Sequence, residues 1–304
     1  MKQKLKALGK AFVYFAVYLL MQVLVSSVFS AVISMRMSME MMVSGKELDI
    51  MAMTDAVMAE VMEKAMVMTF IAGVVTLLIF WVVFLVRKKK FIKEVCIRKI
   101  PVSGILPITI MAASFNVITT VIISFMPWPQ EWMDSYVQNS SAIDNSLMTW
   151  LTAVFMAPVL EEIVFRGLMY TRLKKGFPAI AAAIVTSLAF GIAHGTVIWA
   201  IYTFIFSMIL IWMFEKFQSL TPCIVLHMAY NLSGMALSLI PEEAGIVVLI
   251  LFAISIAGVI LAYKMIVKVT ADIPKMEKVV EIEAVLLEDG LDVGEAASVN
   301  ETEK

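Results

Sequence analysis

Long apolar runs without charge dominate the sequence, and short charged segments separate them. A helix needs about 20 apolar residues to cross a hydrocarbon layer of about 30 Å, and in lipid a single segment satisfies its backbone hydrogen bonds only as a helix. Runs that approach this length are 11–34, 65–86, 101–126, 147–173 with a charged interruption, 177–194, 196–214, 217–240 and 244–263. The pattern predicts an all-α, polytopic transmembrane helix bundle of about eight spans.

Lysine and arginine collect in every second connection between these runs. Their positions are the N-terminus, 87–99, 172–175, Lys216, Lys264 and Lys268. The alternate connections 127–146 and 241–245 contain neither residue type. Because positively charged loops stay on the cytoplasmic side, we expect both termini to be cytoplasmic and the chain to be a multi-pass protein of the cell membrane.

The composition agrees with a membrane protein. The chain is 61% hydrophobic and 16% charged, which lies far outside the range of ordinary soluble domains. Its net charge of −1 leaves no basic face for a nucleic acid. Cys96 and Cys223 are too few and too far apart for a disulfide framework or a thiolate metal site.

The apolar runs predict one transmembrane domain over residues 1–272. An acidic segment, 273–304, follows it and predicts a disordered cytoplasmic tail, since it lacks the apolar surface needed to fold alone. The segment 35–64 is rich in methionine. Clustered thioethers can bind Cu(I), but flexible apolar side chains on a surface helix against the bilayer are the favoured interpretation.

The charged motif in the fourth run is the strongest functional signal. Ionisable side chains at membrane depth are costly and mark functional sites by default. Glu162 and Arg166 are four residues apart on one helix face, which predicts an ion pair. Glu161 is rotated from Glu162 by about 100°, so the two carboxylates face different surroundings. Pro158 has no N–H, which in an α-helix leaves the carbonyl of Val154 without its partner.

The chain has only two histidines, and both lie in apolar runs. His194 follows Phe190 by four residues, and His227 precedes Asn231 by four, so each pair shares a helix face. With a rise of about 1.5 Å per residue, Glu161 and His194 come out nearly level on an antiparallel helix pair.

The depths of the two histidines do not agree on straight helices. His194 would stand about 30 Å above the next basic loop, so the helices here must be tilted, broken or of unequal height. Gly191 and Gly195 offer a place for a break. The level of His227, about 15 Å from the cytoplasmic end, predicts a pocket that faces the cytoplasm.

One Glu, two His and one Asn fit peptide-bond hydrolysis. A buried Glu can act as general base on water, and His with Asn can donate hydrogen bonds to a tetrahedral oxyanion. Zinc bound by Glu161, His194 and His227 is the alternative, but the His-Glu-x-x-His signature and a third histidine are missing. We therefore favour a site without a cofactor and keep zinc as the second possibility.

Three motifs together resemble the CAAX protease and bacteriocin-processing (CPBP, or Abi) family of intramembrane proteases, which includes the type II CAAX prenyl endopeptidases. The resemblance covers the motif-bearing core, about 147–239. The motifs are Glu161-Glu162-x-x-x-Arg166, Phe190-x-x-x-His194 and His227-x-x-x-Asn231.

This resemblance implies a role for each motif residue. Glu161 would be the general base and His194 would share its water, while His227 and Asn231 would form the oxyanion hole. The supporting positions would be Glu162, Arg166 and Phe190. The implied substrate is a short or lipid-modified peptide met in the membrane lipid.

Two functions from other classes also fit a buried carboxylate. A membrane partner could give immunity to a bacteriocin by binding alone, and a transporter could use Glu161 as a proton relay. Transporters commonly show an internal repeat of broken helices, and the sequence shows none.

Overall fold

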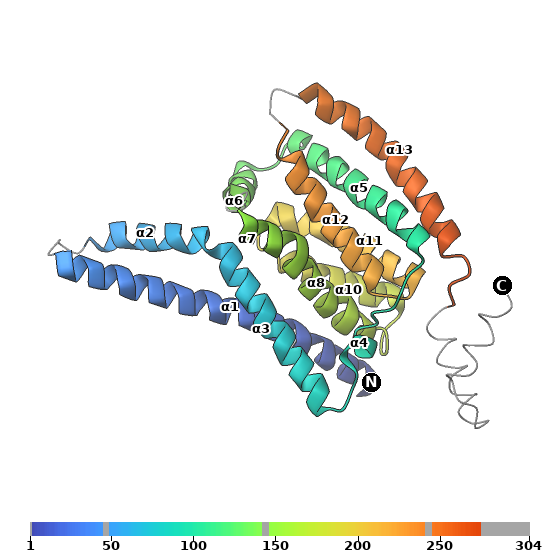
Figure 1. Cartoon of the computed structure of the whole chain (residues 1–304), viewed down its shortest axis with the longest axis horizontal. Coiled ribbons are helices and arrows are strands. Elements are labelled where there is room, and N and C mark those ends of the chain that lie inside the picture. Colours follow the sequence, from blue (N-terminus) through green and yellow to red (C-terminus); the bar gives the residue numbers. More distant parts are fainter. Residues whose placement is uncertain (1, 45–48, 142–145, 241–244, 275–304) are drawn as a thin grey trace.

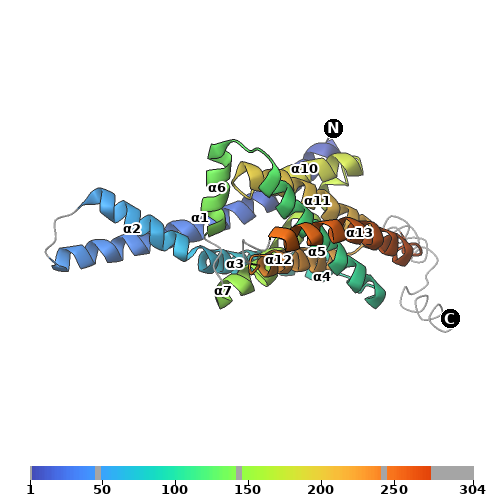
Figure 2. The same ribbon diagram turned by 90° about the horizontal axis from the view of Figure 1, so that it is seen from above.

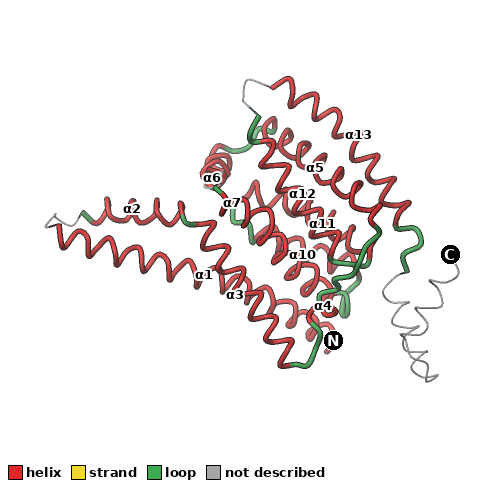
Figure 3. The backbone as a smooth tube through the Cα atoms, viewed as in Figure 1, coloured by secondary structure: helices red, strands yellow, loops and turns green. Residues whose placement is uncertain are grey.

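The computed structural model describes residues 2–44, 49–141, 146–240 and 245–274 (Figure 1). Over these residues all regular secondary structure is helical (Figure 3), which confirms the predicted all-α membrane bundle. The predicted acidic tail lies outside the described residues from 275 onward.

The helices follow the apolar runs closely. The longer ones are α1 (Lys2–Ser44), α3 (Ala65–Val86), α5 (Ile105–Phe125), α11 (Val197–Phe217) and α13 (Gly245–Val269). The shorter ones are α2 (Ile50–Glu63), α4 (Phe91–Glu94), η1 (Val102–Gly104), α6 (Gln130–Ser141), α10 (Ala179–Ile192) and α12 (Thr221–Leu237). One continuous helix, here called the central helix, consists of α7 (Leu147–Trp150), η2 (Leu151–Met156), α8 (Ala157–Glu162), η3 (Ile163–Tyr170) and α9 (Thr171–Leu173).

Six of these helical segments in the described part of the chain are long and apolar enough to cross a membrane: Lys2–Ser44, Ala65–Val86, Val102–Phe125, Leu147–Leu173, Val197–Phe217 and Gly245–Val269. The fifth and seventh predicted spans correspond to α10, with 14 residues, and α12, with 17. Both are short for a full crossing. The count of eight and the cytoplasmic termini therefore stay predictions.

The central helix lies in the middle of the bundle and packs against α12, α3, α10 and α1. On one side α5 lies between α12 and α13, and on the other lie α3 and α1 (Figure 1). Helices α10 and α11 pack against each other. This packing buries one continuous apolar core, which includes Phe165, Phe190 and Phe206.

The helix pair α1 and α2 extends away from the bundle in both views (Figures 1 and 2). With 43 residues, α1 is about 65 Å long, twice what a hydrocarbon layer requires. The methionine-rich segment is helical over 35–44, at the end of α1, and over Ile50–Glu63, as expected for a surface helix. No residue of α2 is buried, and Met39, Met42 and Met51 are exposed.

The lysines and arginines of separate connections meet at one end of the bundle, here called the basic end. The contacts that join its segments are Gln3 to Lys175, Arg172 to Glu94, Ser219 and Thr221 to Arg98, Lys174 to Glu215, and Gly104 with Phe217 and Val269. The alternating charge pattern in the sequence is thus a real segregation of charge in space.

Candidate active site

Glu162 and Arg166 form the predicted ion pair in the centre of the bundle. Arg166 Nη1 donates to Glu162 Oε1 over 2.9 Å, and both side chains are fully buried. The guanidinium also lies over the Phe190 ring, 4.4 Å from its centroid, where the ring's negative face stabilises a cation. Phe190 therefore supports Arg166 as well as the histidine that follows it.

The same carboxylate oxygen also binds His227. Glu162 Oε1 lies 2.8 Å from His227 Nδ1, and because an ionised carboxylate only accepts, Nδ1 carries the hydrogen. This bond fixes the imidazole ring and leaves Nε2 as its second nitrogen. Glu161 Oε2 lies 3.9 Å from that Nε2, too far for a hydrogen bond. A water oxygen beside this gap could contact both atoms.

Two π-helical segments, η2 and η3, flank the acidic pair in the central helix. Such insertions occur mostly at functional sites. In η2 the Ala157 N–H donates five residues back, to Thr152. In this register the next donor would be Pro158 to Ala153, and Pro158 has no N–H. The Asn231 amide donates to the Ala153 carbonyl instead, over 2.7 Å.

The carbonyl that lacks its helical donor is not the one expected from the sequence. An α-helical register places the carbonyl opposite Pro158 at Val154, whereas the π register moves it to Ala153. Since a backbone carbonyl only accepts, the bond also fixes the orientation of the Asn231 amide. Its second N–H remains for the neighbouring cavity.

Of the three alternatives for the depth conflict, a break near Gly191 and Gly195 is present. The helix α10 ends at Ile192, and Gly195 has a φ of 83° in the left-handed region. His194 thus lies in the turn before α11 rather than inside a span, which removes the conflict in depth. Its Nδ1 donates to the Phe190 carbonyl over 2.7 Å, leaving Nε2 available to the cavity.

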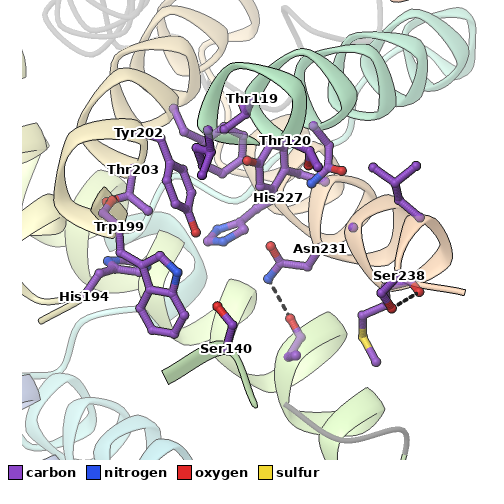
Figure 4. A pocket seen from close by; sticks show the side chains of 18 of the residues that line it. Thr119, Thr120, Ser140, His194, Trp199, Tyr202, Thr203, His227, Asn231 and Ser238 are labelled. Atoms are coloured by element: carbon purple, nitrogen blue, oxygen red, sulfur yellow. Dashed lines mark hydrogen bonds between the residues drawn. The ribbon is translucent and has the colours of Figure 1, made fainter. Parts of the chain in front are cut away.

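A cavity of about 470 Å³ brings the separate motifs together (Figure 4). All four predicted catalytic side chains and one supporting residue line it: Glu161, His194, His227, Asn231 and Phe190. The two remaining supporting residues, Glu162 and Arg166, lie behind this wall. The adjacent carboxylates therefore face different surroundings, as their helical rotation predicts.

The cavity lies on the side of Glu161 remote from the basic end. In each helix the lining residues come from the half that points away from the basic end, or from the middle: Asn116 to Ile123 in α5, Trp199 to Phe206 in α11, and His227 to Leu237 in α12. The sequence analysis expected an opening toward the basic loops from the level of His227 alone. In the structure α12 contributes only His227 and residues beyond it, on the side away from the basic end.

Several lining residues were not selected from the sequence. Tyr202 and Thr203 from α11 line the walls (Figure 4). Tyr136 from α6 also lines the cavity. Asn116 both lines the cavity and contacts α12 where Gly234 allows a close approach. The polar positions Asn116, Thr119 and Thr120 in one apolar run were the signal that could have identified this wall.

The residues do not form a ready zinc site. Among the described residues no three His, Cys, Asp or Glu side chains are arranged to hold one metal ion. His194 and His227 each have Nδ1 tied and Nε2 available, as metal-binding histidines do. Glu161 does not complete the set with them in this arrangement, so no catalytic step is assigned to a metal.

Comparison with known proteins identifies the region that carries the site. Residues 143–233 match the family model described as type II CAAX prenyl endopeptidase Rce1-like. This segment contains all three motifs, and the match confirms the family resemblance found in the sequence. No curated protein and no solved structure matches the chain. The family match and the apolar helices indicate a multi-pass membrane protease.

Proposed function

We propose that this chain, whose residues 143–233 match the Rce1-like family, is an intramembrane endopeptidase that hydrolyses a peptide bond of a short or lipid-modified peptide. One observation carries the proposal. Glu161 is the only carboxylate in the described lining of the cavity, and both histidines and Asn231 line the same space. These are the groups that water activation and oxyanion stabilisation require.

In the first step Glu161 acts as general base. It takes a proton from a water held beside it, and His194 accepts the second hydrogen of that water at Nε2. The water oxygen then attacks the peptide carbonyl carbon, and the C=O electron pair moves to the carbonyl oxygen. When the tetrahedral intermediate collapses, the C–N bond breaks and Glu161 returns its proton to the leaving amine.

His227 and Asn231 stabilise the oxyanion in this scheme. Asn231 donates its second amide N–H. His227 donates from Nε2 as imidazolium, because its Nδ1 hydrogen is already bound to Glu162. The buried charges then balance, since two carboxylates face one guanidinium and one imidazolium. Such pairing is what buried charges need.

Glu162 and Arg166 are positioning residues. Glu162 holds the His227 ring through Nδ1, and Arg166 neutralises Glu162 at the same carboxylate oxygen. Neither residue lines the cavity, so neither touches the reacting atoms.

The proposal is tested with purified protein in detergent and a peptide library. Wild type should cleave, and Glu161→Gln should lose at least about 100-fold in rate, because a general base contributes about 10²–10⁴. The matched control is Glu215→Gln, a half-buried carboxylate at the basic end paired with Lys174. Full cleavage by Glu161→Gln would refute the proposed role.

Zinc is tested in the same preparation. A site without a metal predicts cleavage that persists after chelation and less than stoichiometric zinc in the protein. Loss of cleavage on chelation, restored by adding zinc, would instead support a metalloprotease that uses Glu161, His194 and His227.

A further inference from the structure

The cavity is closed toward the basic end by a layer of fully buried side chains. This layer contains Glu162, Phe165, Arg166, Leu168, Leu210, Phe214 and Cys223, each with at most 1% of its surface exposed. The layer has no open space, because close-packed interiors leave few voids larger than a water. A peptide cannot reach Glu161 through it without unpacking the core.

In the opposite direction the side chains of the cavity wall become progressively more exposed. His227 is 4% exposed and Phe190 is fully buried, whereas Ser238, at the far end of α12, is exposed. The outer rim includes Tyr136 and Ser140 from α6, which lies in the connection before the central helix. The Tyr136 ring contacts Trp199 edge to face, with centroids 6.4 Å apart. The mouth is therefore at the α6 side.

The mouth and the basic end lie at opposite ends of the bundle. The connection that contains α6, residues 127–146, has no lysine or arginine but carries Glu131 and Asp134. The basic end gathers the cationic connections. Because cationic connections remain cytoplasmic, the rim that α6 forms belongs on the other side of the membrane.

We infer that the site opens to the non-cytoplasmic face of the membrane and takes a peptide segment presented from that side. The kind of substrate in this inference rests on the proposed endopeptidase function. The side of the membrane to which the site opens does not. Apart from Glu161 the described lining has no Asp, Glu, Lys or Arg side chain, and it carries hydroxyl and amide groups. It therefore fits an uncharged, extended segment beside the outer surface, whose backbone it can hydrogen-bond.

Cysteine labelling tests the direction. In a Cys96→Ser, Cys223→Ser background, a single cysteine is placed at Ser238 on the rim or, as a matched control, at exposed Ser103 next to the basic end. Intact cells are treated with a membrane-impermeant maleimide. We expect labelling of Ser238→Cys in intact cells and of Ser103→Cys only after permeabilisation. The reverse pattern, or protection of Ser238→Cys until permeabilisation, would overturn the inference.

A second measurement separates this inference from the proposed function. An impermeant, uncharged peptide that the detergent preparation cleaves is added outside intact cells that express wild type or Glu161→Gln. Cleavage outside by wild type alone supports both. Glu161-dependent cleavage in detergent and in permeabilised cells, but none outside intact cells, contradicts only the direction. Outside labelling of Ser238→Cys with no cleavage in detergent contradicts only the protease.

Discussion

At the residue scale, a rotation of about 100° separates the roles of two adjacent carboxylates. Glu161 lines the cavity with its side chain 12% exposed, while Glu162 is fully buried and holds Arg166 and His227. The sequence predicted the Glu162–Arg166 pair because four-residue spacing is a local property of a helix. It could not predict the Glu162–His227 bond, which depends on how α12 is rotated against a helix 65 residues away.

Asn231 also has a structural role that a substitution can separate from catalysis. Asn231→Ala should lower the rate about 10²–10³-fold through loss of an oxyanion donor. It should also destabilise the fold by about 1–3 kcal/mol, because the Ala153 carbonyl loses its donor. Peptide cleavage and thermal unfolding in detergent measure the two effects.

Pro158→Ala provides the matched background for this substitution, because it restores a backbone N–H opposite Ala153. The stability cost of Asn231→Ala should then be smaller, while the rate stays low. An equal stability cost in both backgrounds would show that the Ala153 carbonyl does not depend on Asn231.

At the element scale, the site depends on irregular helix ends and turns. The π segment η2 and the turn at His194 depart from a regular α-helix. The conflict in the depth of His194 was predictable, and Gly191 and Gly195 marked a place where a break could resolve it. The π register was not predictable, because Pro158 permits an unpaired carbonyl at either Ala153 or Val154 and packing decides between them.

Gly191 allows α10 and α11 to approach each other closely. A Cβ there would lie 2.7 Å from the Ala200 carbonyl oxygen, so backbone must move. Gly191→Ala should destabilise the protein by about 1–3 kcal/mol and lower cleavage by displacing His194. The control Gly9→Ala, at an exposed helical position with open space, should be neutral or stabilising by up to about 1 kcal/mol. Equal thermal unfolding of both variants would contradict the close approach.

At the scale of the whole molecule, charge segregation gives the bundle two different ends. The apolar runs predicted the helical bundle and its charged connections well. They did not predict that α10 and α12 are short, because hydropathy is insensitive to where a turn begins. They also could not show which half of each helix lines the cavity, because the depth of one histidine does not determine it.

The basic end includes a carboxylate whose ionisation stabilises the fold. Burial alone would raise the pKa of Glu94, but the hydrogen bond from Lys89 and the charge of Arg172 lower it below its ordinary value of 4.5. Because the folded-state pKa is the lower one, its stabilising effect is present above pH 4.5 and is lost as the pH falls through the folded-state value.

The Glu94→Gln variant should therefore unfold at a lower temperature than wild type at neutral pH. The difference should shrink as the pH falls below about 4.5, where wild type also loses the charge. Thermal unfolding across this range measures the effect, with exposed Glu63→Gln as control. A difference between Glu94→Gln and wild type that does not change with pH would contradict the electrostatic origin.

Side-by-side kinetics and thermal unfolding of Glu161→Gln and Glu162→Gln test the division of labour in the site most directly. Glu161→Gln should abolish cleavage and leave the unfolding temperature unchanged, since its side chain lines a cavity. Glu162→Gln should destabilise the fold by about 3–5 kcal/mol, because it leaves Arg166 buried without its counter-ion. Retained cleavage by Glu161→Gln, or an unchanged unfolding temperature for Glu162→Gln, would contradict the assignment of chemistry to the first carboxylate and support to the second.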